Sequence, residues 1–231
     1  MRTGGAPRLS LSATDNGMRA LRSAVRRHAD YLEVDVRVSK DDHLVLMHDV
    51  TVGRTTNGSG QVARKTGKRI HQLRLDDGGT VPYLRQALRL ARSVDVRILV
   101  ELKAMGTTAS YQRLASLVDR FGSRRVTVMS SHRVYLDQFR VFAPFVDEAV
   151  VTRRAPSAAE AAQFGAVAVH HSAITDHWLA TMDTARIRVF AWTVNTVPVW
   201  NRLSGAVDGI ITDETPGYAN YRRTASACNA A

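Results

Sequence analysis

Acidic side chains interrupt an apolar strand pattern near the start of the chain. In the stretch 31–39, Glu33 and Asp35 alternate with Val34 and Val36, and residues two apart on a strand project from the same face. If helices cover the face with the valines, both carboxylates face an interior cavity, where their charges need a cation or a proton. The pattern therefore indicates a metal site on a strand.

A second apolar run, residues 44–48, follows after only four residues. This connection is too short for a crossover to a parallel neighbour, so the two runs are predicted to form a hairpin. The hairpin returns His48 toward the level of Glu33 and Asp35.

Helix and strand patterns alternate along the rest of the chain. Asp15 or Asn16 is predicted to cap a helix over residues 17–28, and residues 1–14 and 50–80 are predicted to be loops. After Pro82 the predicted helices span 83–93, 108–121, 133–142, 157–163, 175–184 and 196–203. The predicted strands span 97–103, 125–130, 148–152, 166–170, 187–193 and 209–213. Such alternation is typical of parallel strands covered by helices.

These elements predict an α/β fold, a (β/α)₈ TIM barrel, in a single domain over residues 1–231 with a polar tail from about residue 219. With the strand at 31–38 the count is seven, whereas a closed barrel needs eight and typically runs to roughly 250 residues. We therefore expect the first strand to be missing or degenerate. That would leave backbone groups of the strands at 31–38 and 209–213 unpaired, and the chain poorly soluble or marginally stable.

Composition limits the binding partners and the cellular location that we expect for this protein. The net charge of +11 favours anionic partners, including peripheral contact with an anionic membrane, although arginines scattered over every helix also fit genome composition. No run of five basic residues occurs, so nucleic acid is not predicted as a partner. The single cysteine, Cys228, excludes internal disulfides and cysteine metal sites. Without a transmembrane run or signal peptide the chain as written is expected to be cytoplasmic; a secreted location, given an upstream signal peptide, and the oligomeric state stay open.

Further candidate residues lie at the carboxyl ends of predicted strands, where TIM barrels carry their active sites. They are Glu101, Lys103, Trp192 and Asp213. Carboxylates on Glu33, Asp35 and Glu101, without cysteine, suit a hard divalent ion, Mg²⁺ or Ca²⁺.

The other candidates have both a functional and an ordinary interpretation. His48 suits a general acid or base that Asp49 orients, or a solvated hairpin residue. Lys103 suits a ligand for a phosphate oxygen, or a strand-end lysine in water. Trp192 suits a substrate wall or a core residue. His132, His170 and His171 also follow strands, but spacing alone makes them weak candidates.

Taken together, these residues resemble the glycerophosphodiester phosphodiesterase family over nearly the whole chain. Seven segments match in order: 32–36, 45–49, 54–60, 77–84, 100–103, 192–195 and 208–213. The resemblance implies a TIM barrel that cleaves a small-molecule glycerophosphodiester to glycerol 3-phosphate and an alcohol. It implies a divalent metal on Glu33, Asp35 and Glu101. It also implies that His48 is one of two acid-base histidines and that Lys103 binds phosphate.

The sequence departs from the family pattern at two places. Asp15 stands where the family has a glutamate of longer reach. The family's first strand ends in His-Arg-Gly, whereas Arg2 here follows Met1 and no histidine occurs before His28. By the same resemblance Arg2 is a substrate-binding residue, and either the start lies upstream or the chain is a truncated, impaired relative.

Two other functions stay open at this point. A related lipid phosphodiesterase of the sphingomyelinase D or lysophospholipase D type would share the acids and His48 but act on membrane-embedded substrates. A truncated inactive relative would bind anionic head groups without turnover.

Overall fold

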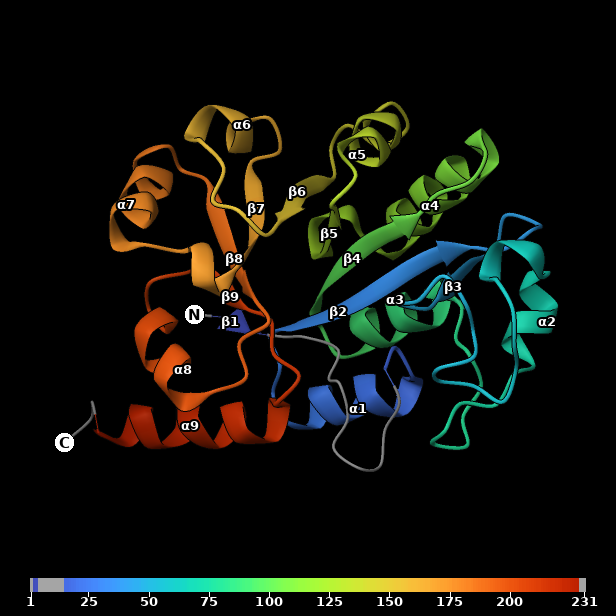
Figure 1. Ribbon diagram of the computed structural model, residues 1–231, viewed down its shortest axis with the longest axis horizontal. Coiled ribbons are helices and arrows are strands. Elements are labelled where there is room, and N and C mark those ends of the chain that lie inside the picture. Colours follow the sequence, from blue (N-terminus) through green and yellow to red (C-terminus); the bar gives the residue numbers. More distant parts are fainter. Residues whose placement is uncertain (1, 4–14, 229–231) are drawn as a thin grey trace.

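A curled sheet of mostly parallel strands forms the centre of the computed structural model, which describes residues 2–3 and 15–228 (Figure 1). The strand order is β1-β9-β8-β7-β6-β5-β4-β2-β3, and β3 alone is antiparallel to its neighbour. The strands are β1 (Arg2–Thr3), β2 (Tyr31–Val38), β3 (Leu44–Leu46), β4 (Arg97–Ala104), β5 (Val126–Ser130), β6 (Asp147–Thr152), β7 (Ala166–His170), β8 (Arg188–Trp192) and β9 (Gly209–Ile210).

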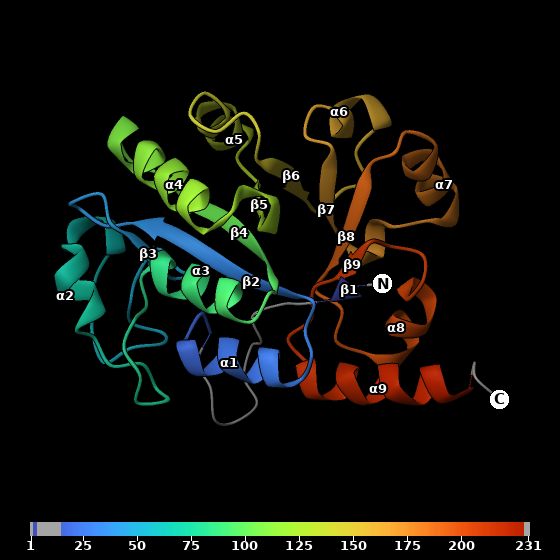
Figure 2. The same cartoon turned by 180° about the vertical axis from the view of Figure 1, so that it is seen from behind.

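Helices cover the outer side of this sheet, as the reverse view shows (Figure 2). They are α1 (Met18–Arg26), α3 (Leu84–Ser93), α4 (Thr108–Phe121), α5 (Arg133–Arg140), α6 (Ala158–Ala162), α7 (Asp176–Thr184), α8 (Val197–Leu203) and α9 (Thr215–Cys228). Helix α2 (Gly67–His71) lies beside β3 instead (Figure 2). The alternation predicted after Pro82 is confirmed, as is the hairpin of β2 and β3. Within the described part of the chain, no helix is both long and apolar enough to cross a membrane.

The first strand, expected to be missing or degenerate, is present as the two residues of β1. Arg2 pairs in parallel with Gly209, and Thr3 pairs with Ile210. With β1 the sheet has eight parallel strands in the order of a TIM barrel. The expectation that the backbone of β9 is unpaired on this side is therefore wrong. Among the described residues, no strand pairing joins β1 to β2.

The backbone of β2 is also hydrogen-bonded along the edge that faces this seam, contrary to expectation. Val36–Val38 pair with β3. One residue earlier, the Asp35 N–H donates to Oδ1 of Asn16 at 2.8 Å, and its carbonyl accepts from the N–H of Met47 at 3.0 Å. These contacts satisfy backbone groups that an open edge would leave without partners.

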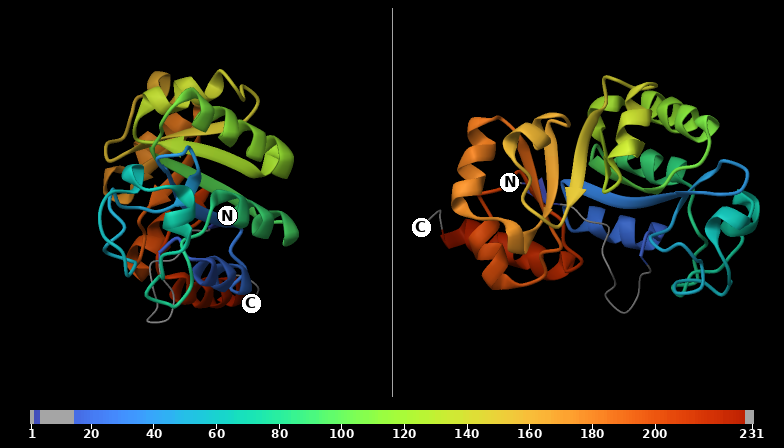
Figure 3. Two further views of the ribbon diagram at one scale, coloured as in Figure 1. Left: turned by 90° about the vertical axis from the view of Figure 1, so that its right-hand side faces the viewer. Right: turned by 45° about the horizontal axis from the view of Figure 1, so that its top comes forward.

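Apolar side chains pack on both faces of the curled sheet, whose curvature Figure 3 shows in two further views. Val34 and Val36 are fully buried in the large core between the strands and the outer helices, so the predicted alternation along β2 is confirmed. On the inner face, Tyr31, Leu99 and Phe190 belong to a smaller cluster. The Tyr31 and Phe190 rings meet edge to face, 5.7 Å apart. This cluster closes the inside of the barrel below the carboxylates of β2.

Two helices lie where the sequence pattern predicts none. Helix α2 lies within the stretch predicted as a loop; it has five residues, too few to show a helical period, although Oγ1 of Thr66 caps it by accepting from Arg69 N. Helix α9 occupies most of the expected polar tail. The Tyr218 and Tyr221 rings of α9 pack against the Trp200 ring at 5.2 and 5.6 Å, so aromatic contacts hold it on the barrel.

A buried acid on β6 depends on one arginine of α5. Glu148 is 5% exposed, and its Oε2 accepts from Arg140 Nε at 3.0 Å, while its Oε1 is buried without a hydrogen bond. Burial raises the pKa of Glu148, and the hydrogen bond from Arg140 acts in the opposite direction. Removal of the arginine would leave a buried carboxylate without its partner.

We expect Arg140→Met to lower the free energy of unfolding by about 1–3 kcal/mol, because the buried carboxylate of Glu148 loses its partly exposed hydrogen-bond donor. Arg133→Met is the matched control: it also lies on α5 and over Phe164, but its pair with Glu160 is exposed. Such surface pairs contribute about 1 kcal/mol or less. Equal losses for the two variants in urea denaturation would contradict this assignment.

Candidate active site

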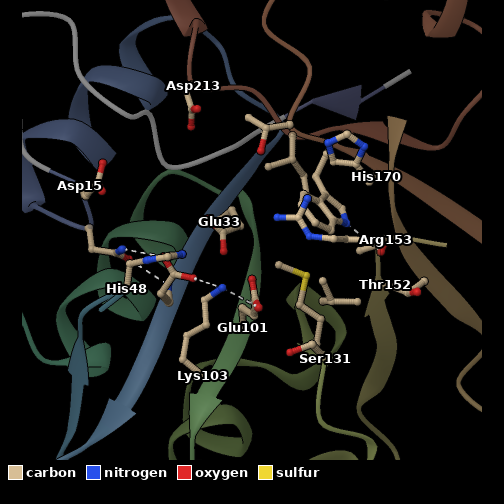
Figure 4. A pocket seen from close by; sticks show the side chains of 18 residues that line it. Asp15, Glu33, His48, Glu101, Lys103, Ser131, Thr152, Arg153, His170 and Asp213 are labelled. Atoms are coloured by element: carbon tan, nitrogen blue, oxygen red, sulfur yellow. Dashed lines mark hydrogen bonds and ion pairs between the residues drawn. The ribbon is translucent and has the colours of Figure 1, made fainter. Parts of the chain in front are cut away.

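A cavity of about 710 Å³ opens at the carboxyl ends of the strands (Figure 4). Strands β2 and β4–β8, together with the segments after β5, β6, β8 and β9, contribute to its wall. The lining residues are Asp15, Asn16, Glu33, Asp35, His48, Glu101, Lys103, Met129, Ser131, Val151, Thr152, Arg153, Ala168, His170, Trp192, Thr193, Ile211 and Asp213.

Three carboxylates converge on one side of this cavity. The parallel register of β2 and β4 pairs Asp35 with Glu101, and one ligand oxygen from each of these residues and Glu33 lies within 4.8 Å of the others. Burial, followed by the neighbouring carboxylate of Asp35, raises the pKa of Glu33 well above its usual value. Burial and Asp35 also raise the pKa of Glu101. The cluster therefore holds more negative charge than its surroundings stabilise.

Lys103 offsets part of this charge. Its Nζ lies 2.7 Å from Oε1 of Glu101 and 3.4 Å from Oδ1 of Asp35. Burial alone would lower the pKa of Lys103, but the two carboxylates outweigh it, so the pKa is raised and the ammonium stays charged. One ammonium beside three carboxylates leaves a net negative charge that a divalent cation could neutralise.

The donor set suits such a cation. All three ligand groups are carboxylates, the hard oxygen donors that Mg²⁺ and Ca²⁺ prefer. Asn16 orients one of them, because its Nδ2 donates to Oδ2 of Asp35 at 2.8 Å while its Oδ1 accepts from the Asp35 N–H. The expectation that Asp15 or Asn16 caps α1 is wrong, since the N-cap is Gly17 and no side chain caps the helix.

His48 follows β3 and is held in place by two residues, Asp49 and Arg37. Its Nδ1 donates to Oδ1 of Asp49 at 2.8 Å, and its carbonyl accepts from Nε and Nη2 of Arg37 at 2.9 and 2.8 Å. The hydrogen bond from Arg54, with a smaller contribution from His48, lowers the pKa of Asp49 to about 2 although burial acts in the opposite direction. Arg54 also reaches Oδ2 of Asp15 at 3.0 Å. With Nδ1 engaged, Nε2 is the nitrogen available to a substrate.

Other expected candidates divide between the cavity and the surface. Trp192 lines the cavity, and its Nε1 donates to the carbonyl of Ala168 at 2.9 Å. His170 lines it too, with its ring at 86° to the Trp192 ring. Asp213 is fixed by Asn195, whose Oδ1 accepts from Asp213 N at 2.9 Å. His132 and His171 are not among the lining residues.

Sequence reasoning did not single out Ser131, Thr152 and Arg153, which line the cavity at the carboxyl ends of β5 and β6. The sequence signal that could have found them is their position at the end of a predicted strand, the same signal that identified Glu101 as a candidate. Arg2 lies in β1, but its side chain, expected to bind substrate, lies outside the described residues.

Comparison with known proteins identifies the family. The model of the glycerophosphoryl diester phosphodiesterase family matches residues 5–216. The chain belongs to this family.

One relative and two solved structures match this chain over most of their length. A glycerophosphodiester phosphodiesterase of Caldanaerobacter subterraneus is 27% identical over 239 residues, covering 93% of this chain and 94% of the relative. The crystal structure of a glycerophosphodiester phosphodiesterase from Agrobacterium tumefaciens has a TM-score of 0.83 and 22% identity, covering 95% of this chain and all of that one. A phosphodiesterase of Oleispira antarctica, solved in complex with the product sn-glycerol-3-phosphate, has a TM-score of 0.79 and 20% identity, covering 92% and 93%. These structures confirm the glycerophosphodiester phosphodiesterase fold.

The raised pKa values predict how the stability of this phosphodiesterase family member depends on pH. In the metal-free fold the carboxyls of Glu33 and Glu101 titrate above their usual 4.5, so the stability gained from their protonated forms is complete below that pH and is lost as the pH rises through the raised values. We expect the free energy of unfolding, measured with a chelator, to fall as the pH rises above 4.5 and through the raised pKa values of the two carboxyls. Mg²⁺ or Ca²⁺ should restore it by binding the native carboxylates.

Denaturation at a series of pH values, with chelator or with excess ion, measures this effect. The variant Glu33→Gln is the control, because removal of one titrating carboxyl should flatten the fall. Coincident curves with chelator and with ion would contradict the expectation.

Proposed function

We propose that this protein hydrolyses glycerophosphodiesters to glycerol 3-phosphate and an alcohol in a reaction that depends on a divalent metal. The convergence of Glu33, Asp35, Glu101 and Lys103 within one cavity supports this proposal most strongly. Membership of the family and the product bound to the Oleispira antarctica phosphodiesterase also support it.

Each group of the cluster has a distinct role in binding the phosphate. Glu33, Asp35 and Glu101 would hold Mg²⁺ or Ca²⁺, and such an ion, when bound, supplies positive charge that neutralises the phosphate oxygens. Lys103 Nζ adds a second positive charge beside the same position. Its contact with Glu101 keeps the ammonium at the floor of the cavity rather than in solvent.

His48 moves the proton. Its Nδ1–H donates to Asp49, so Nε2 is unprotonated in the neutral ring and accepts a proton from an attacking hydroxyl or returns one to a leaving alcohol. Arg54 holds Asp49 in turn and ties it to Asp15. A hydroxyl of the substrate next to the phosphate serves as the first nucleophile: it attacks phosphorus as His48 takes its proton, and the bond from phosphorus to the alcohol oxygen breaks. The alcohol leaves with a proton returned by His48, and water then opens the resulting cyclic phosphate to give glycerol 3-phosphate.

We expect the protein with Mg²⁺ or Ca²⁺ to release glycerol 3-phosphate from glycerophosphodiesters, and a chelator to abolish the release. Glu101→Gln removes a metal ligand, and His48→Gln removes the proton-transfer group, so each should lower kcat by a factor of roughly a hundred to ten thousand. His132→Gln is the matched control, because this histidine also follows a strand but is exposed outside the cavity.

Release can be measured with a coupled assay for glycerol 3-phosphate. Wild-type protein that is inactive on every glycerophosphodiester, or whose activity survives chelation, would refute the proposal. Turnover of sphingomyelin or lysophospholipid vesicles without turnover of the water-soluble diesters would instead identify a lipid phosphodiesterase.

A further inference from the structure

The wall of the cavity away from His48 carries a positive charge that the mechanism does not use. Arg153 follows β6, and in Figure 4 it lies with Thr152 and His170 across the cavity from His48 and Asp15. Among the described residues, no carboxylate lies within ion-pair distance of its guanidinium. The guanidinium contacts an aromatic ring instead: Cζ of Arg153 lies 5.4 Å from the centroid of the Trp192 ring. The cavity thus has an acidic side and a separate cationic side.

The Trp192 ring is fixed by its neighbours. Nε1 of Trp192 donates to the carbonyl of Ala168, and the His170 ring packs edge to face with it, 5.1 Å away. An exposed indole face in a cavity normally favours a cationic group such as an ammonium. Here the guanidinium of Arg153 already lies over the ring, so a second cation would meet a like charge. An anion there would gain both the charge of Arg153 and a planar pair of donors.

From this arrangement we propose that Arg153, held over Trp192, determines substrate specificity and selects glycerophosphodiesters whose alcohol carries an anionic group, such as a carboxylate. The inference rests on the proposed function, with the phosphate at Glu33, Asp35 and Glu101, and it assigns the alcohol end of the diester to the side of the cavity that carries Arg153. A cavity of about 710 Å³ is large enough for a diester that reaches from the carboxylates to this arginine, since ligand pockets commonly measure about 300–1,000 Å³.

Glycerophosphoserine and glycerophosphoethanolamine form a matched pair, because they differ by one carboxylate. We expect kcat/KM for the serine diester to exceed that for the ethanolamine diester by roughly tenfold to a hundredfold, the range for a hydrogen bond to a charged group. Arg153→Gln should remove this preference while keeping turnover of the ethanolamine diester. Arg153→Lys should retain part of it, because a lysine keeps the charge and loses the planar donors.

Arg154→Gln is the control. This neighbouring arginine is exposed and does not line the cavity, and its contacts with Thr152 involve its backbone. The preference should survive this substitution. Equal kcat/KM for the two diesters, a preference for ethanolamine, or a serine preference that survives Arg153→Gln would overturn the inference while glycerol 3-phosphate release still upheld the proposed function.

A binding measurement tests the role of Arg153 independently of turnover. Calorimetry with Mg²⁺ or Ca²⁺ present should show tighter binding of phosphoserine than of phosphoethanolamine to the wild-type protein and equal binding to Arg153→Gln. This result without hydrolysis of either diester would refute the proposed function and support the role of Arg153. Equal binding to the wild-type protein would overturn that role.

Discussion

Three carboxylates held together in a largely buried position are the constraint on which the rest of this structure depends. Like charges within 4.8 Å repel one another, and burial removes the water that would otherwise screen them. Lys103 neutralises only one of the three charges. Burial and the remaining repulsion between the carboxylates raise the pKa values of Glu33 and Glu101. A structure that keeps such a cluster must hold it rigidly, and a divalent cation bound to the carboxylates would stabilise it.

Strands β2 and β4 hold the three carboxylates in this position. Their parallel register sets Asp35 beside Glu101, while Val34 and Val36 anchor the opposite face of β2 in the outer core. The segment after β3 carries His48, and a separate apolar cluster fastens it through Val45, Met47, Val52, Val62, Ile70, Leu75, Val81 and Tyr83. His48, the proposed proton-transfer group, and the carboxylates are therefore positioned by neighbouring strands that pack in separate apolar clusters.

The barrel and the acidic half of the site were predictable because strong local patterns encode them. Alternation along β2 and the repeated strand–helix period needed no tertiary information. The two residues of β1 and the five of α2 are too short to show any period. Asn16 reaches Asp35 across 19 residues of sequence, and its local signal, that of a helix cap, indicated a different role. Arg153 could not be separated from the other arginines until the fold placed it over Trp192.

A crystal structure grown with Ca²⁺ and glycerol 3-phosphate would test the central claim most directly, because it shows the ion, the phosphate and the carboxylates together. The account predicts one ion bound by oxygens of Glu33, Asp35 and Glu101 at about 2.3–2.6 Å. A phosphate oxygen should complete its coordination, with Nζ of Lys103 within hydrogen-bond distance of the phosphate. An ion bound elsewhere, with the phosphate remote from these carboxylates, would contradict the account.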